Sequence, residues 1–345
     1  KMKKNILYNK INKIELKKKL KDEDFKRITA SFYKYITIED PSIFRNNLFL
    51  LLNKLEIFGR IYVSNEGINA QISVPEKNWG ILYIKLETIR ELKKITIKKA
   101  LQEGKSFYKL TIKVRDELVA YGLSSKSYNM KHVGKHLDAV EYNNAIENPK
   151  TTVVDMRNYY ESEIGRFENA IIPNVETSKE LLPEVKKILK GKEKDQILLY
   201  CTGGIRCEKA SAYLIESGFK NVSQLSGGII QYAHDIKEKD LKSKFKGKNF
   251  VFDQRLGERV TDDIISNCHI CGDVCDEHTD CKNDACHILF IQCLNCSEKY
   301  QGCCSTECQN FAALPTDQQK IFRKDPKRII SRTYFDSHIK PKLNS

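Results

Sequence analysis

The chain has 345 residues, 41% of them hydrophobic and 30% charged, which is enough for two or three globular domains. No apolar run approaches the roughly 20 residues of a membrane-spanning helix, and the lysine-rich start lacks the apolar stretch of a signal peptide, so we expect a cytoplasmic protein without a membrane anchor. Lysine and arginine number 59 against 45 acidic residues, and the formal charge of +14 favours a polyanionic partner such as nucleic acid.

The positive charge is concentrated in residues 1–21, 85–113, 237–248 and 323–342. Such patches are typical of proteins that bind nucleic acid phosphates. A general bias of the composition toward lysine is the alternative explanation. The chain also has 12 cysteines, and in a reducing compartment clustered cysteines indicate metal binding or thiol chemistry rather than disulfide bonds.

The first domain is predicted from alternating strand and helix patterns that follow a charged lead-in with weak helical periodicity, residues 1–25. Asp40 and Pro41 provide an N-cap and a first-turn proline for a helix through about Phe58. A hairpin is expected around Asn65-Glu66-Gly67, where glycine permits a tight turn. This order of elements predicts a ferredoxin-like (acylphosphatase-like) α+β domain over residues 26–125. Its elements are a strand at 28–36, the helix already named, strands at 60–64 and 68–74, a helix at about 76–92, and strands near 95–100 and 109–114.

A polar segment at 122–134 leads into a second domain, expected over residues 126–240. The nearly continuous apolar run at 196–200 is typical of a strand buried in a parallel sheet. Alternating strands and helices predict an α/β domain, in which ligands bind at the carboxyl ends of the strands. The other elements expected there are strands at 151–156 and 221–225 and helices at 179–189 and 207–218.

Cys201 begins a six-residue loop between the buried strand and the next helix. Backbone N–H groups and the helix N-terminus stabilise negative charge on such a sulfur, and Arg206 adds a cation. These surroundings lower a cysteine pKa from about 8.5 toward neutrality, which makes Cys201 the candidate nucleophile. Cys207, in the first helical turn, is either a resolving thiol or a small buried residue. Asp155 and Arg157, at the end of an earlier strand, either orient the loop or are only structural.

This loop resembles the active loop of the rhodanese family, Cys-x-x-Gly-x-Arg or Thr. Here it reads Cys201-Thr202-Gly203-Gly204-Ile205-Arg206. Further similarities lie at residues 154–157, 163–170 and 225–228. The resemblance implies a rhodanese α/β domain in which Cys201 carries a persulfide or a comparable adduct. Tyrosine phosphatases fit less well, because they place one more residue between cysteine and arginine and a histidine before the cysteine.

A cysteine-rich segment is expected over residues 263–312, between a basic linker at 241–262 and a basic tail at 313–345. Two Cys-x-x-Cys pairs about twenty residues apart indicate a zinc site with four thiolate ligands. The remaining cysteines suffice for a second structural ion, so about eight of ten are expected to be ligands. His269, His278 or His287 can replace a thiolate, and an iron–sulfur cluster is the alternative. The candidates are Cys268, Cys271, Cys275, Cys281, Cys286, Cys293, Cys296, Cys303, Cys304 and Cys308.

Over nearly its full length the chain is similar to the rhodanese-domain tRNA uridine(34) hydroxylases. The similarity rests on residues 64–70, 200–209, 250–255 and 281–287. It implies conversion of uridine to 5-hydroxyuridine at the tRNA wobble position, with dioxygen as co-substrate, Cys201 essential, and the anticodon stem-loop held through its phosphates. An unpaired base splayed from that loop would stack on an aromatic side chain. The available aromatic residues are Tyr8, Tyr33, Tyr62, Trp79 and Tyr108.

The residues leave the oxygen chemistry open. The sequence has no flavin or NAD fingerprint and no histidine–carboxylate spacing that identifies an iron site. Cys201 either adds to C6 of uracil, which makes C5 nucleophilic, or is itself oxidised and transfers the oxygen. A persulfide sulfurtransferase acting on tRNA or a protein acceptor is the alternative function, and a non-catalytic zinc-dependent RNA-binding protein is a third. The electron source, the tRNAs modified and the oligomeric state do not follow from the sequence.

Overall fold

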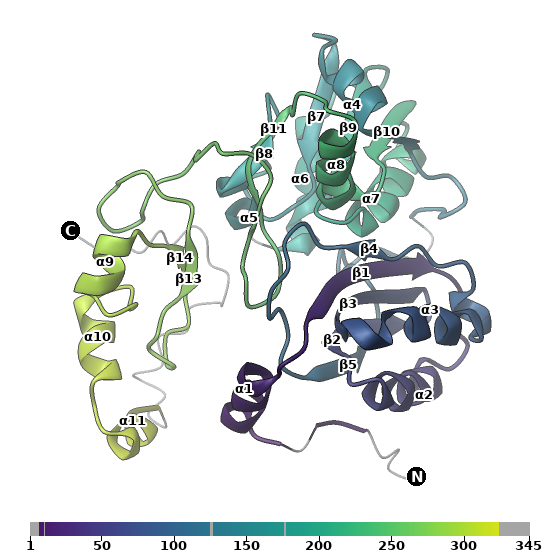
Figure 1. Ribbon diagram of the computed structural model, residues 1–345. Coiled ribbons are helices and arrows are strands. Elements are labelled where there is room, and N and C mark those ends of the chain that lie inside the picture. Colours follow the sequence, from purple (N-terminus) through teal and green to yellow (C-terminus); the bar gives the residue numbers. More distant parts are fainter. Residues whose placement is uncertain (1–6, 10, 125–126, 176, 324–345) are drawn as a thin grey trace.

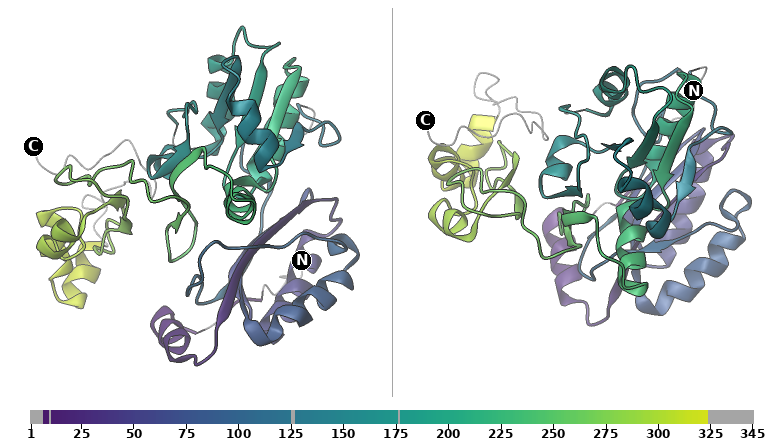
Figure 2. Two further views of the ribbon diagram at one scale, coloured as in Figure 1. Left: turned by 45° about the horizontal axis from the view of Figure 1, so that its top comes forward. Right: turned by 90° about the horizontal axis from the view of Figure 1, so that it is seen from above.

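The computed structural model describes residues 7–9, 11–124, 127–175 and 177–323, which form three parts (Figure 1). The N-terminal sheet and its helices lie below the central parallel sheet, and the cysteine-rich part lies to one side of both, as the two views of Figure 2 also show. This arrangement confirms the predicted fold class of an α+β part, an α/β part and a cysteine-rich part. Within the described ranges, none of the helices has the length and apolar character needed to cross a lipid bilayer.

The N-terminal part is, within the described residues, a five-stranded sheet of order β4-β1-β3-β2-β5. Strand β3 pairs antiparallel with β1 and β2, which gives the first four strands the order of the predicted ferredoxin-like fold. Strand β5 is added at the edge, parallel to β2. The elements are α1 (Lys13–Asp22), β1 (Arg27–Tyr35), α2 (Pro41–Lys54), β2 (Phe58–Ser64), β3 (Gly67–Pro75), η1 (Glu76–Asn78), α3 (Trp79–Glu87), η2 (Arg90–Leu92), β4 (Lys98–Lys99) and β5 (Leu110–Val114).

Side chains along these strands alternate between a buried face and an open face. On the buried face Ala30 and Phe32 of β1 and Ala70 of β3 pack with α2 and α3 in one apolar core. Helix α2 begins where the sequence predicts, because the side chain of Asp40 accepts hydrogen bonds from the N–H groups of Ser42 and Ile43. The open face is turned toward the central part (Figure 1).

Three elements of the N-terminal part differ clearly from the prediction. Helix α2 ends at Lys54 rather than near Phe58, because Glu56 turns to a φ of +54° and Phe58 starts β2. The helix expected over 76–92 is divided into η1, α3 and η2, with Ile89 in an extended conformation between the last two. The strand expected near 95–100 is reduced to two residues that pair with β1.

The central part is a four-stranded parallel sheet, within the described residues, of order β6-β10-β9-β7. Strands β8 and β11 pair antiparallel beside it, so the segment expected as a basic linker returns to this part of the molecule. Strand β12 extends that second sheet. The elements are β6 (Lys135–Leu137), α4 (Ala139–Ile146), β7 (Thr151–Asp155), α5 (Tyr159–Glu163), β8 (Gly165–Phe167), α6 (Ser178–Ile188), β9 (Gln196–Tyr200), α7 (Ile205–Glu216), β10 (Asn221–Leu225), α8 (Gly228–Glu238), β11 (Phe245–Asn249) and β12 (Glu258–Arg259).

The cysteine-rich part has little regular structure and a core built largely from sulfur. Cys281, Cys286 and Cys303 pack with Ile288 and Phe290 in one cluster of buried residues. Of the expected basic tail, residues 313–323 are described and include a helix, whereas the lysines and arginines beyond them lie outside the described residues. The elements are β13 (His278–Asp280), β14 (Leu289–Ile291), α9 (Leu294–Lys299), α10 (Thr306–Ala312) and α11 (Thr316–Arg323).

Candidate active site

Cys201 lies at the carboxyl end of β9, in the interior of the parallel sheet, and the chain turns from it directly into α7. The Gly204 N–H donates a hydrogen bond to the Cys201 Sγ over 3.2 Å. Gly204 has a φ of +102°, and a Cβ atom there would lie 2.8 Å from the Tyr33 hydroxyl oxygen, so both conformation and space require glycine. The helix begins two residues earlier than predicted, at Ile205, which places Arg206 and Cys207 in its first turn.

The surroundings of Cys201 favour a thiolate. Burial raises its pKa, but a hydrogen bond from the Cys207 side chain, the charge of Arg206 and the N–H groups of Cys207 and Gly204 outweigh burial and bring the pKa to about 6. Burial and the neighbouring Cys201 raise the pKa of Cys207 well above its ordinary value. At neutral pH the pair is therefore a Cys201 thiolate and a Cys207 thiol. Cys201 is only 1% exposed, so its sulfur is enclosed by the loop.

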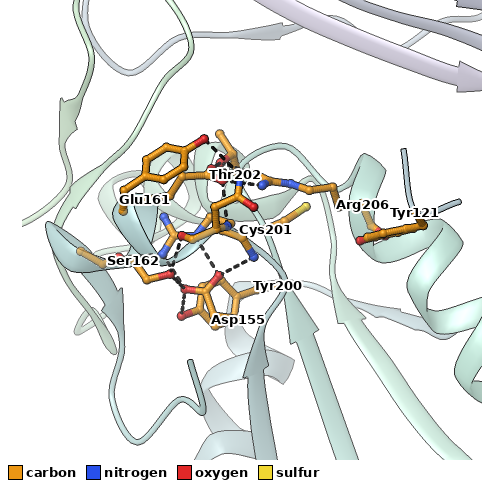
Figure 3. A network of polar contacts seen from close by, with 12 residues as sticks. Tyr121, Asp155, Glu161, Ser162, Tyr200, Cys201, Thr202 and Arg206 are labelled. Carbon is orange, nitrogen blue, oxygen red and sulfur yellow. Dashed lines mark hydrogen bonds and ion pairs between the residues drawn. The ribbon is translucent and has the colours of Figure 1, made fainter. Parts of the chain in front are cut away.

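Arg206 is held by Glu161, a residue that the sequence interpretation missed. The guanidinium donates to both carboxylate oxygens, over 2.6 and 2.8 Å, and to the Thr202 hydroxyl over 3.1 Å (Figure 3). Glu161 is fully buried at the third position of α5, where it also caps the N–H of Asn158. The spacing Asn158-x-x-Glu161 is a capping-box pattern, so the sequence did contain a signal for this position.

Asp155 and Arg157 form a separate ion pair that supports the loop from below. Both are fully buried, and Arg157 donates to the two oxygens of Asp155 over 2.9 and 2.7 Å. The Tyr200 hydroxyl and the Ser162 hydroxyl donate to Asp155 over 2.6 and 2.8 Å (Figure 3). Because Tyr200 directly precedes Cys201, this network fixes the end of β9 from which the loop starts.

The N-terminal part also contacts the loop. The ammonium group of Lys98, on β4, donates to the Gly203 carbonyl over 2.6 Å, and the Tyr35 hydroxyl donates to the Ile205 carbonyl over 3.1 Å. The Tyr33 hydroxyl donates to Glu208 over 3.0 Å. Burial lowers the pKa of Lys98 to about 8, although the negative charges of Cys201 and Glu208 oppose this shift. The loop is therefore held by two domains at once.

Beside these contacts, a cavity of about 460 Å³ lies between the loop and the open face of the N-terminal sheet. Thr202, Gly203, Ile205 and Arg206 line one side of it, whereas the enclosed Cys201 does not reach its surface. Two of the five aromatic residues that the sequence offers for stacking, Tyr33 and Tyr62, line the cavity, whereas Tyr8, Trp79 and Tyr108 do not. Two further aromatic residues, Tyr160 and Phe252, also line it and were missed from the sequence. The segment 251–255 closes another side.

The ten clustered cysteines divide into two groups of four and two single residues. Within each group the four sulfurs lie within 4.8 Å of one another among the described residues. Individual pairs are 3.6 Å apart (Cys271 and Cys293) and 3.8 Å apart (Cys286 and Cys304). The groups are Cys268, Cys271, Cys293 and Cys296, and Cys281, Cys286, Cys304 and Cys308, which leaves Cys275 and Cys303 outside both.

These spacings fit one tetrahedral ion in each group, because Zn–S bonds of about 2.3 Å place the sulfurs about 3.8 Å apart. An iron–sulfur cluster would insert its own iron and sulfide atoms and spread the four sulfurs more widely. Backbone N–H groups donate to the sulfurs of Cys268 and Cys281, over 3.3 and 3.4 Å, and stabilise thiolates there. None of His269, His278 and His287 belongs to either group in the described residues.

His269 has another partner. Its Nε2 lies 2.8 Å from Glu163 on α5, the short helix that also carries Glu161. The cysteine-rich part therefore contacts the helix that holds Arg206.

Comparison with known proteins agrees with this architecture. The chain matches the UPF0176 acylphosphatase-like domain at residues 27–118, the rhodanese-like domain at 138–235 and the rhodanase C-terminal family at 246–309. The fold and the cysteine loop thus define a multidomain protein of the rhodanese-like class.

Relatives span nearly the whole chain. A tRNA uridine(34) hydroxylase of Leptospira interrogans is 48% identical over 343 residues, covering 99% of this chain and 93% of that protein. A tRNA uridine(34) hydroxylase of Yersinia pestis (strain Pestoides F) is 49% identical over 320 residues, covering 92% of this chain and 90% of that protein. The chain belongs to the tRNA uridine(34) hydroxylase family. A solved Anabaena structure, of the Alr3790 protein, is 22% identical, with a TM-score of 0.26 over 32% of this chain and 91% of that chain.

Proposed function

We propose that this protein hydroxylates uridine at wobble position 34 of tRNA to 5-hydroxyuridine, with dioxygen as co-substrate. The observation that carries the proposal is the match along nearly the full chain to relatives named for this reaction. The site is consistent with it, since a thiolate loop adjoins a cavity with aromatic and cationic walls. Such a cavity suits a base that has been turned out of an RNA loop.

Cys201 is the proposed chemical centre, and Arg206 the cation beside it. Either Cys201 adds to C6 of the uracil ring, so that C5 becomes nucleophilic toward oxygen, or an oxidised Cys201 transfers the oxygen. Both routes start from the thiolate that the pKa of about 6 provides at neutral pH. A covalent adduct of tRNA and protein, trapped by rapid quenching, supports the first route; an oxidised Cys201 without an adduct supports the second.

The other loop residues and their supports take indirect roles in this proposal. Thr202, Gly203, Gly204 and Ile205 enclose the sulfur, and all of them except Gly204 also line the cavity. Asp155 and Arg157 hold the start of the loop through Tyr200. Cys207 supplies the hydrogen bond that keeps Cys201 ionised. This assignment makes Cys207 a proton-bearing donor and not the partner in a disulfide.

We further propose that each group of four thiols binds one structural zinc ion, giving two ions per chain. Their role is to fold a segment whose apolar core is too small to be stable alone. The anticodon stem-loop is the proposed binding partner and the cytoplasm the proposed location, in keeping with the charge of +14 and with relatives named for a tRNA substrate.

Mass spectrometry of tRNA nucleosides tests the proposed function. Cells lacking the protein are complemented with wild type or with Cys201→Ser, and Cys275→Ser serves as a thiol control outside the loop. We expect 5-hydroxyuridine-type nucleosides to be lost in the deletion and restored by wild type and Cys275→Ser only. Their presence in the deletion strain, or their restoration by Cys201→Ser, contradicts the proposal.

One observation favours sulfur transfer as a second candidate. The Cys201 sulfur is enclosed by loop N–H groups, a setting that also stabilises a persulfide. The same experiment separates the two functions, because hydroxylation adds an oxygen atom to the nucleoside whereas thiolation exchanges oxygen for sulfur. Loss of a thiolated nucleoside with 5-hydroxyuridine intact identifies the sulfurtransferase.

A further inference from the structure

The open face of the N-terminal sheet carries polar and aromatic side chains, whereas the opposite face forms the apolar core. On β3, Ile68, Ala70 and Ile72 are fully buried in the core, and the alternate residues Asn69 and Gln71 line the cavity instead. A strand with this alternation presents one face to a core and the other to water or a ligand. Here the second face lies against the cysteine loop rather than in open solvent.

The strand register arranges these side chains in two rows across the sheet. Asn69 is paired with Tyr33 on β1 and with Tyr62 on β2. Gln71 is paired in the same way with Ser31 and Arg60. Neighbouring strands are about 4.8 Å apart, so each amide lies between the two side chains of its row.

The two amides are partly exposed in the cavity, where they can bond water or a ligand. Among the described residues, the side chains of Asn69, Gln71 and Ser31 make no hydrogen bond with another protein group, although all three are half-buried. Each amide offers donors and an acceptor in one plane. Closing a ligand over them removes water, and this is unfavourable unless the ligand supplies matching acceptors and donors. The face therefore suits a flat ligand with an edge of alternating acceptors and donors.

The two rows lie next to the cysteine loop, so a ligand bound on them would lie close to the reactive thiol. The Tyr33 hydroxyl oxygen approaches Gly204 of the loop, so a ligand seated on Asn69 faces the wall of the cysteine site. Cations flank the face on both sides, with Lys98 at the β4 edge and the Arg115 guanidinium 5.4 Å from the ring centre of Tyr62 at the β5 side. Phosphates on either side of a turned-out nucleotide find positive charge at these places.

We propose that this face binds the pyrimidine base of a single-stranded RNA loop, with Asn69 and Gln71 reading its Watson–Crick edge and Tyr62 stacking on its ring. The inference rests on the proposed function and adds the residues that recognise the base. Uracil presents an acceptor, a donor and an acceptor along that edge, which two amides can match. Arg60, in the row of Gln71, only donates and so selects a carbonyl oxygen over the amino group of cytosine.

The test combines a change in the RNA with a change in the protein. Anticodon stem-loop RNA is prepared with uridine or 3-methyluridine at position 34, since methylation removes the N3–H donor and leaves the ring and the stem intact. Its affinity is measured for wild type, for Asn69→Ala/Gln71→Ala, and for Asn47→Ala, which removes an exposed amide of α2 that does not line the cavity. Circular dichroism and thermal melting verify that the variants are folded.

Wild type is expected to bind the methylated RNA roughly 10-fold or more weakly than the uridine RNA. The double variant is expected to bind the uridine RNA roughly 10- to 100-fold more weakly than wild type and to lose the discrimination against methylation. Asn47→Ala retains the full discrimination. The proposal is overturned if the double variant discriminates between the two RNAs as strongly as wild type does. It is also overturned if wild type binds both RNAs equally well.

The binding result is separate from the reaction. If the nucleoside analysis shows no hydroxylation but this discrimination depends on Asn69 and Gln71, the base site stands and the proposed function fails. If hydroxylation is confirmed and the double variant discriminates as wild type does, the function stands and the base site fails. Tyr62→Phe, which keeps the ring, is expected to bind like wild type, whereas Tyr62→Ala binds roughly 10-fold more weakly; equal binding by both variants contradicts the stacking role.

Discussion

At the scale of single residues, Cys201 and Cys207 form an unequal pair within one loop. The same contact that helps lower the pKa of Cys201 to about 6 raises that of Cys207, since the proton is retained by the thiol that donates the hydrogen bond. Arg206 supplies positive charge, but Glu161 partly neutralises it. The thiolate therefore depends on close hydrogen bonds as well as on the arginine.

Replacing Cys207 tests this dependence through pH. The rate of wild type is expected to be constant between pH about 6 and pH about 8 and to fall below pH about 6, because protonation removes the thiolate. In Cys207→Ala the hydrogen-bond donor is lost, so the Cys201 pKa rises and the acidic limb of the rate profile moves to higher pH. At pH 6 the rate of this variant is expected to be roughly 3- to 10-fold lower than that of wild type. The alkylation rate of Cys201 as a function of pH measures the same shift without turnover.

The matched variant is Cys207→Ser, whose hydroxyl can still donate. We expect its pH profile to lie close to that of wild type. Identical profiles for Cys207→Ala and wild type would show that Cys207 only fills space.

The sequence was informative about some of these residues and not about others. The spacing of Cys201, the glycines and Arg206 identified the loop, because all of them lie within one short segment. Glu161 lies forty positions earlier by sequence number and was missed, although Asn158 and Glu161 form a recognisable capping box. A cap explains why a glutamate is present there, but only the fold reveals that its carboxylate also binds Arg206.

At the scale of elements, β4 is the shortest strand of the N-terminal sheet and yet carries a contact with the active loop. It has two residues, and they have different partners: Lys98 binds the Gly203 carbonyl, whereas Lys99 packs over Trp79 on the other side. From the sequence both belong to one lysine-rich stretch. Their difference arises only from the alternation of side chains along a strand at the sheet edge.

Lys98→Met is expected to lower kcat/KM by roughly 10-fold or more, because it removes a charge-assisted hydrogen bond to the loop. Lys99→Met is the control and should remain within about twofold of wild type. Steady-state kinetics with tRNA measures both. Equal effects of the two substitutions would indicate general loss of positive charge instead.

The pKa of Lys98 adds a second readout. Because burial lowers this pKa to about 8, its ammonium loses its proton above that pH, and wild type is expected to lose activity there. Lys98→Arg remains charged and should retain its rate at higher pH. If the rate of Lys98→Arg falls at high pH as the rate of wild type does, the loss of activity arises from a group other than Lys98.

At the scale of the whole molecule, the order of strands and helices was sufficient to predict the α+β and α/β parts. The pairing of β8 with β11 was not predictable, because strands of three and five residues far apart in the chain are too short to show a clear periodicity. Helix ends at Lys54 and Glu87 were misplaced for a local reason, since apolar residues continue past both ends into the next element. The fold was needed to show which cysteines lie together in two groups of four among the described residues, and their number as metal ligands remains a prediction.

Metal content tests the grouping of the cysteines. We expect two zinc ions per chain in wild type and in Cys275→Ser, whose thiol lies outside both groups, and close to one in Cys268→Ser. Elemental analysis of the purified proteins gives these numbers. Loss of an ion from Cys275→Ser, or two ions in Cys268→Ser, contradicts the assignment.

Removal of the metal is expected to unfold the cysteine-rich part first. A strong chelator should make residues beyond about 264 sensitive to protease, because metal binding provides most of the folding free energy of such segments. The central sheet has its own apolar core and should remain protected. Simultaneous digestion of both parts would show that they unfold together.

The cavity is walled by segments as far apart as residues 29–33, 60–71, 202–206 and 251–258. During synthesis the chain emerges from the ribosome in order, so the early sheet and the cysteine loop both exist before the last wall does. A nascent or truncated chain ending before residue 251 thus has a complete reactive loop but lacks one wall of the cavity. We therefore expect selectivity for the substrate to arise only when the last quarter of the chain is being made.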